Sequence, residues 1–198
     1  MSEIFNPLLL SHELRNWLAT KTLGGVARKG TFQYYDKHLW LPVRNHIESI
    51  LEHSRRTPDD LELLSCCYTG ELFRVQNYNE RARSYVYPLG CYQSWATENG
   101  LTALSGIGGQ VLVIHGYARP EDYAIRTIDL MVYMQPEIWG PLFSGTHELS
   151  RYCREHEVAM PITKKSIVGM YVVEAKDLAN WRNCGIPLAQ EKWFRNNW

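Results

Sequence analysis

The sequence predicts an α+β protein in which a helical N-terminal layer packs on a β core. Helical apolar patterns fill the first 65 residues, and short apolar strand patterns fill most of the remainder. The regular strand–helix alternation of a parallel sheet is missing, which favours segregated helices and strands. At 198 residues and 23.0 kDa, we expect one domain over 1–198, with a helical layer at 1–65 and the β core at 66–198.

Two helices are expected in the N-terminal layer. The first begins at Ser11, a residue type that caps helices, and ends at about residue 22, before a glycine pair. The second runs from about Pro42 to Arg55, because proline suits a first helical turn and an apolar stripe follows it. The segment 24–35 between them is expected to be a loop or a short hairpin.

Strand patterns begin near residue 65, and the clearest is the apolar run Val111–His115. Near Ser94 a strand is expected to end and a helix to follow, towards Leu104. The last two strands are expected to pair as a hairpin across the turn at 163–165. The other expected strands are 71–76, 85–87, 128–134 (with a helical turn as the alternative), 155–160 and 166–173.

Composition narrows the possible functions. Lys+Arg and Asp+Glu both count 21, so no broad basic face for duplex nucleic acid is indicated, although a local patch stays possible. The five cysteines lack zinc-ligand spacing and indicate reduced thiols in the cytoplasm. The seven histidines do not cluster, so no metal site is expected. Neither a signal-peptide pattern nor an apolar run of membrane length is visible.

Three polar features stand out within the apolar patterns. Arg74 lies inside the strand pattern Leu72–Val75 and needs an anionic partner, either a structural salt bridge or a ligand. Ser94 is either a helix N-cap or a hydroxyl that contacts a ligand. Glu155 and Glu157 would project from one face of a strand, either as solvated edge residues or as a pair of interacting carboxylates.

The order of these features along the chain suits a phosphate- and ribose-containing ligand. A guanidinium binds phosphate, a serine hydroxyl binds a sugar hydroxyl, and a glutamate stabilises a ribose whose anomeric carbon becomes cationic. Glu174 is a second candidate for the acid, because it also ends an apolar strand. It ranks below Glu157, because Val172 stands two residues before it and no proline follows.

The chain resembles the ADP-ribosyltransferases of the arginine–serine–glutamate class, and among them the host-modifying transferases of T-even-like bacteriophages. The segments that carry the resemblance are Phe73-Arg74, Ser94-Trp95-Ala96-Thr97 and Glu155-His156-Glu157-Val158-Ala159-Met160-Pro161. The resemblance implies a split two-sheet core with NAD+ bound between the sheets. The sequence departs from the family at Val75, where glycine is usual, and at Ala96-Thr97, where a second serine or threonine is usual.

The resemblance also implies roles for the site residues. Arg74 would hold a phosphate or the adjacent ribose, and Ser94, with Thr97 as a substitute hydroxyl, would position the nicotinamide ribose. Glu157 would be the catalytic acid beside the anomeric carbon, and Glu155 would orient or deprotonate the acceptor. NAD+ is the co-substrate, and no metal takes part. Candidates for stacking on nicotinamide are Tyr87, Tyr92, Tyr117 and Phe143.

The implied reaction is transfer of ADP-ribose to a host protein, at an arginine, with nicotinamide released. RNA polymerase and ribosomal or other translation proteins are candidate targets, in the cytoplasm of the host if a phage encodes the chain; no membrane partner is expected. Three alternatives stay open. They are an NAD+ glycohydrolase, a non-catalytic phage or mobile-element protein that binds a host factor, and a nucleic-acid modifier, which the neutral charge disfavours.

Overall fold

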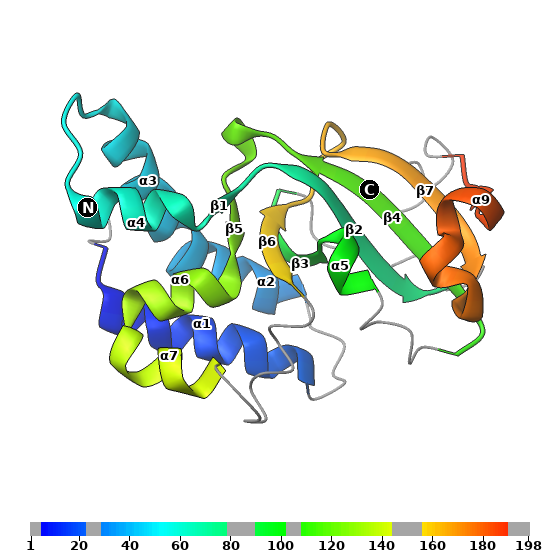
Figure 1. Cartoon of the computed structure of the whole chain (residues 1–198), viewed down its shortest axis with the longest axis horizontal. Helices are drawn as coiled ribbons and strands as arrows, with labels where there is room; N and C mark the ends of the chain where they lie inside the picture. Colours follow the sequence, from blue (N-terminus) through cyan, green and yellow to red (C-terminus); the bar gives the residue numbers. More distant parts are fainter. Residues whose placement is uncertain (1–4, 23–28, 79–89, 102–107, 144–155, 190–198) are drawn as a thin grey trace.

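A computed structural model describes residues 5–22, 29–78, 90–101, 108–143 and 156–189. Figure 1 shows most of the helices gathered at one end of the molecule and the long strands β2, β4 and β7 extending away from them, with α9 at the far end. All strand pairings are antiparallel. The α+β class is therefore confirmed. None of the described helices is long and apolar enough to cross a bilayer.

The strands form one eight-stranded sheet with the order β1-β5-β6-β3-β2-β4-β7-β8. Neighbours in the sheet are mostly distant in sequence, so the chain crosses the sheet repeatedly. The strands are β1 (Cys67–Tyr68), β2 (Gly70–Asn77), β3 (Tyr92–Ala96), β4 (Gln110–Ala118), β5 (Ala124–Arg126), β6 (Glu157–Pro161), β7 (Ile167–Glu174) and β8 (Ile186–Pro187).

The sheet narrows sharply between β2 and β3. These strands are joined at one residue pair, Phe73 with Ala96, whereas β2 and β4 are paired over eight positions from Gly70 to Asn77. We call this place the junction. It divides the sheet into a half with β1, β5, β6 and β3 and a half with β2, β4, β7 and β8. The strands therefore form one sheet with a narrow junction, not the two separate sheets that were expected.

Helices cover the two halves separately. Next to the first half lie α1 (Pro7–Thr22), α2 (Lys29–Tyr35), a π-helix η1 (Asp36–Trp40), α3 (Leu41–Glu52), α4 (Pro58–Ser65), α6 (Thr127–Met134) and α7 (Pro136–Phe143). The short helices are α5 (Glu98–Leu101), η3 (Pro120–Asp122), η4 (Ala175–Asn180) and α9 (Trp181–Cys184). Of these, α5, η4 and α9 contribute buried side chains to the second half.

Three clusters of buried side chains follow this division. The helical core joins α1, η1, α3 and α6 to the face of the first half that carries Tyr92 and Ala159. The distal core joins α5, η4 and α9 to the face of β2 that carries Phe73. The back core lies on the opposite face and draws side chains from both halves, among them Leu72, Trp95, Ile114, Val158, Met160 and Met170.

The N-terminal layer holds α2, η1 and α4 in addition to the two expected helices, and the start of the first helix also differs from the expectation. The first helix begins at Pro7, and the Asn6 side chain accepts a hydrogen bond from the Leu9 amide (3.3 Å), which is the capping role expected of Ser11. Ser11 is instead buried inside the helix and donates to Gln135 Oε1 (2.7 Å). The part of segment 24–35 that is described, Lys29–Tyr35, is helical and not a loop, and Tyr35 packs in the helical core.

The expected C-terminal hairpin is wrong. Strand β6 pairs with β3 and β5, whereas β7 pairs with β4 and β8, so the turn carries the chain from one half to the other. Thr163 and Ser166 hold this turn through hydrogen bonds between each amide and the other hydroxyl (2.9 and 3.1 Å). The helical alternative is confirmed for Thr127–Met134, and the expected strand at 85–87 lies outside the described residues.

Candidate functional site

Arg74, Ser94 and Glu157 lie on three strands that are neighbours in the sheet. Arg74 is on β2, Ser94 is on β3 and Glu157 opens β6, and these strands lie side by side in the order β6-β3-β2. The Arg74 Nη1 atom donates to the Ser94 carbonyl oxygen (2.8 Å) across the junction. Three residues that are far apart in sequence therefore meet where the sheet narrows.

Arg74 is a half-buried cation. Burial lowers the pKa of its guanidinium to about 10, while the negative charge of Glu157 acts in the opposite direction. The guanidinium is therefore charged at neutral pH. Its Nε atom is buried and has no hydrogen-bond partner among the described residues. A buried donor of this kind is costly to leave unpaired, so it marks a place where a ligand oxygen would be stabilising.

Glu157 is the most buried acid of the described chain, with 4% of its surface exposed. Its Oε1 atom accepts a hydrogen bond from Trp17 Nε1 of α1 (3.3 Å). Its backbone oxygen accepts a long hydrogen bond from the Thr127 hydroxyl (3.4 Å). The indole N–H stabilises the carboxylate, because burying a charged group without a hydrogen-bond donor costs roughly several kcal/mol.

The strand register shows which side chains share a face. Ala96 pairs with Glu157 and Ser94 pairs with Ala159, so the side chains of Ser94 and Glu157 leave the same face of the β3–β6 ladder. Arg74 follows Phe73, the partner of Ala96, and its side chain starts from the opposite face. The guanidinium reaches the Ser94 carbonyl because β2 and β3 separate beyond their single pair.

The segment around Ser94 links the site to α5. Ser94 is half-buried in the middle of β3, so it is not a helix N-cap. Trp95 points to the back core and donates from Nε1 to the Met160 carbonyl (3.2 Å). Thr97 precedes α5; its amide donates to the His156 carbonyl (3.4 Å) and its carbonyl accepts from the Gly100 amide (2.9 Å). Thr97 therefore connects α5 to the start of β6.

The two other candidate acids are Glu155 and Glu174. Glu155 lies outside the described residues. Among the described residues β6 begins at Glu157, and His156 before it has a left-handed backbone (φ 43°). Glu174 is exposed at the end of β7 and accepts a hydrogen bond from Gln110 Nε2 (2.9 Å). Three strands separate β7 from β6, so Glu174 is not part of this constellation.

Of the four aromatic candidates for stacking on nicotinamide, two have described side chains, Tyr92 and Tyr117. Tyr92 is buried in the helical core, stacked on Trp40 with ring centroids 5.0 Å apart. Tyr117 is 42% exposed on β4. Tyr87 and the side chain of Phe143 lie outside the described part of the chain. Trp40 Nε1 is buried and has no hydrogen-bond partner among the described residues, and the Trp40 ring contacts Trp17, the donor to Glu157.

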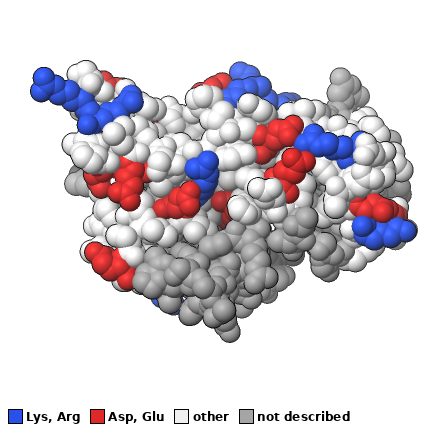
Figure 2. Space-filling view, in the orientation of Figure 1, with Lys and Arg blue, Asp and Glu red and all other residues white. Residues whose placement is uncertain are grey.

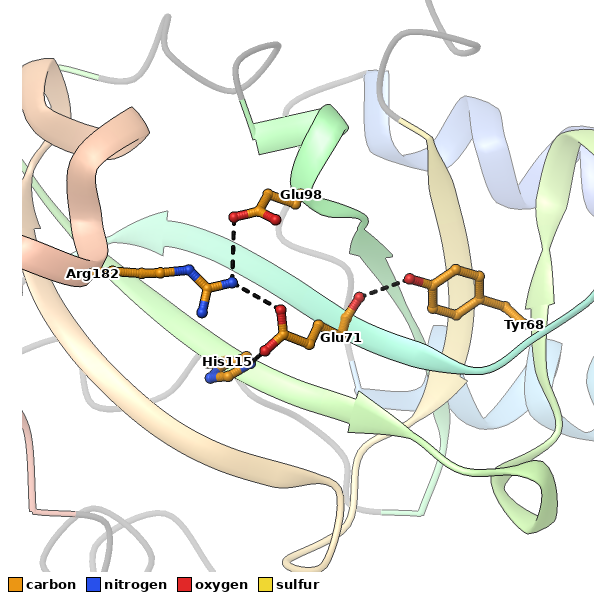
Figure 3. Close-up of polar contacts among 5 residues, drawn as sticks. All are labelled: Tyr68, Glu71, Glu98, His115 and Arg182. Atoms are coloured by element: carbon orange, nitrogen blue, oxygen red, sulfur yellow. Dashed lines mark hydrogen bonds and ion pairs between the residues drawn. The ribbon is translucent and has the colours of Figure 1, made fainter.

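A second polar cluster was not expected from the sequence. Arg182 Nη2 of α9 contacts Glu71 Oε2 (2.8 Å) and Glu98 Oε1 (3.3 Å), and His115 Nε2 lies 3.2 Å from Glu71 Oε1, as Figure 3 shows. The Tyr68 hydroxyl donates to the Glu71 carbonyl (2.9 Å). This cluster ties α9 to β2 and α5. The two-residue spacing of Glu71 and Phe73 on a strand could have placed Glu71 on that face, but nothing in the pattern indicated Arg182.

Trp17 was also missed, because it is 140 positions from Glu157 and reads as one more apolar residue of a helix stripe. Within the described residues no group of three or more His, Cys, Asp or Glu side chains could hold a metal ion. On the face drawn in Figure 2, basic and acidic side chains are interspersed over the described residues. This surface does not form the single-sign stripe typical of duplex binding.

Comparisons with protein-family models, with curated proteins and with solved structures found no match to this chain.

Proposed function

We propose that this protein is a mono-ADP-ribosyltransferase that moves ADP-ribose from NAD+ to a host protein. The observation that carries the proposal is the convergence at the junction. Arg74, Ser94 and Glu157 lie on three neighbouring strands; the Arg74 guanidinium donates to the Ser94 carbonyl oxygen (2.8 Å), and the charge of Glu157 acts on it. The ordered resemblance of the same three segments to the arginine–serine–glutamate transferases supports it.

In the proposed reaction Arg74, Ser94 and Glu157 each have one role. Arg74 offers its charge and its unpaired Nε donor to a phosphate or ribose oxygen of NAD+. The Ser94 hydroxyl, with Thr97 as a substitute hydroxyl, positions the nicotinamide ribose. Glu157 accepts the ribose 2′-hydroxyl and stabilises the positive charge that develops at the anomeric carbon.

The transfer step exchanges one bond for another. The bond between the anomeric carbon and the nicotinamide nitrogen breaks, and its electron pair leaves with nicotinamide. A nitrogen of the acceptor guanidinium donates its own pair to the same carbon and loses a proton to a nearby carboxylate or to water. Glu155 is the proposed group for that proton. Arginine of RNA polymerase or of the translation machinery is the proposed acceptor, following the resemblance.

The deciding experiment incubates the protein with labelled NAD+ and a bacterial lysate. Glu157→Gln keeps an oxygen for the Trp17 hydrogen bond but removes the charge, so labelling is expected to fall by about 10²–10³-fold. Glu174→Gln is the matched control, because it removes an exposed acid at the end of β7 and is expected to label as the wild type does. Equal labelling by wild type and Glu157→Gln contradicts the proposal.

Nicotinamide release separates the remaining candidates. Release by the wild type without a labelled protein indicates an NAD+ glycohydrolase. A non-catalytic binding protein is the second candidate, favoured by the burial of Glu157 at 4% exposure beneath Trp17. In that case the wild type releases no nicotinamide, and Glu157→Gln affects only stability.

A further inference from the structure

The contact between Trp17 and Glu157 joins the helical layer to the acid at the junction. Trp17 Nε1 lies 3.3 Å from Glu157 Oε1, and both side chains are buried, at 3% and 4% exposure. An indole N–H can only donate and an ionised carboxylate can only accept, so the direction of this hydrogen bond is fixed. Its charged acceptor makes it one of the stronger classes of hydrogen bond in proteins.

The Trp17 ring is itself held on several sides. Its centroid lies 5.3 Å from that of Trp40 and 5.5 Å from that of Tyr35, and both pairs are edge-to-face (84° and 86°). Leu10, Leu14 and Leu18 of the same helix stripe are buried beside it in the helical core. A ring packed in this way has little freedom to turn, so its N–H is aimed at one point of the sheet.

We infer that Trp17 is a positioning residue for Glu157, and this inference rests on the proposed function. Its N–H fixes the orientation of the carboxylate and replaces part of the hydration that burial removes. On this account the helical layer completes the site, because α1 supplies the donor that sets the geometry of the acid on β6.

Trp17→Phe tests the hydrogen bond while the aromatic packing is kept. Loss of a hydrogen bond to a charged group is expected to lower kcat for nicotinamide release by about tenfold to a hundredfold. KM for NAD+ is expected to change by less than about threefold, because Glu157 acts mainly on the transition state. Equal losses in kcat and in NAD+ affinity would point to a merely structural role and overturn the inference.

Trp139→Phe is the matched control. Trp139 is buried in the same helical core, and its Nε1 donates to Ser11 Oγ (3.0 Å). The two variants therefore lose the same ring nitrogen from the same layer, and similar melting temperatures are expected. Trp139→Phe is expected to keep kcat within about twofold of the wild type, as for a change remote from the site. If both variants lose kcat equally, the effect comes from the layer as a whole and the inference fails.

A spectroscopic readout separates this inference from the proposed function. The indole N–H resonance of Trp17, assigned as the signal lost in Trp17→Phe, is expected to shift in Glu157→Gln, whereas that of Trp139 stays in place. If the wild type releases no nicotinamide but the resonance shifts, the contact is real and the transferase proposal fails together with the positioning role. If the wild type is active and Trp17→Phe has wild-type kcat, the positioning role alone is overturned.

Discussion

Gly116 lies on β4 where the ring of Trp95 crosses the strand. A Cβ atom at this position would be 2.9 Å from Trp95 Cζ3 and 3.0 Å from the Ser166 carbonyl oxygen. Trp95 is 2% exposed and cannot swing away. We therefore expect Gly116→Ala to lower the free energy of unfolding by about 1–3 kcal/mol, as overpacking does in other cores.

Urea denaturation of Gly116→Ala and of Gly108→Ala measures this effect. A Cβ at Gly108 would have no atom within 4 Å, so that variant is expected to be neutral or to gain up to about 1 kcal/mol. Equal stability of the two variants would show that the back core accommodates a methyl group against Trp95.

At the residue scale, the polar groups of the candidate site could be predicted because each interrupts an apolar pattern. Arg74 and Glu157 stand out in this way, and the sheet brings them close together. Trp17 could not be predicted, because it agrees with the apolar stripe of its own helix, and a hydrogen bond across 140 positions leaves no local pattern. A residue that fits the apolar pattern of its own helix, as Trp17 does, shows its polar contact only in the tertiary packing.

His115 connects several elements at the distal end of the sheet. Its ring stacks on Phe73 of β2 (5.1 Å), and its Nε2 faces Glu71 at 3.2 Å, with Arg182 of α9 and Glu98 of α5 beside it. Burial lowers the pKa of His115 below its ordinary value, and the charge of Glu71 opposes this only in part.

Stability is therefore expected to fall on mild acidification. In the unfolded chain His115 takes up a proton near pH 6.5, whereas in the folded protein it does so only at a lower pH. The stability that the neutral side chain contributes is therefore complete above about pH 6.5 and is lost as the pH falls through the lowered pKa of the folded state. Urea unfolding at pH 7.5 and at about pH 5 checks the sign. Between these two pH values the His115→Phe variant should lose less stability than the wild type. The control variant His53→Gln, changed at an exposed position, should lose as much stability as the wild type. A steeper loss in His115→Phe would contradict the assignment.

At the element scale, strand positions could be predicted but strand partners could not. The strand pattern at 71–76 and the apolar run of β4 are local signals, and both strands are present. The two faces of β6 pack into different cores, one into the helical core and one into the back core, and this packing determines which strands pair with β6. The short turn after β6 therefore indicated a hairpin, whereas packing placed β6 and β7 in different halves.

The whole molecule is held together by a core that helices and sheet share. Leu14 of α1 is fully buried in the same cluster as Tyr92 of β3 and Ala159 of β6. We expect Leu14→Ala to lower the free energy of unfolding by about 2–5 kcal/mol. Leu9→Ala, at a position 59% exposed on the same helix, should stay within about 0.5 kcal/mol of the wild type.

Far-UV and near-UV circular dichroism test the single-domain organisation in the same variants. Because the cluster spans both layers, secondary and tertiary signals are expected to change in one transition for the wild type and for Leu14→Ala. Separate transitions would show that residues 1–65 fold apart from the strands. The α+β class was predictable at this scale, but the share of α6 and α7 in the helical core was not. The narrow junction was not predictable either, because no residue pattern records how many positions two strands share.

A single residue pair joins the two halves of the sheet, so few main-chain hydrogen bonds fix the angle between β2 and β3. The side chains packed behind the junction, with Trp95 and Met160 among them, therefore have a large share in setting that angle. Arg74 lies in one half and Glu157 in the other. The distance between these two charged residues consequently depends on apolar residues of the back core.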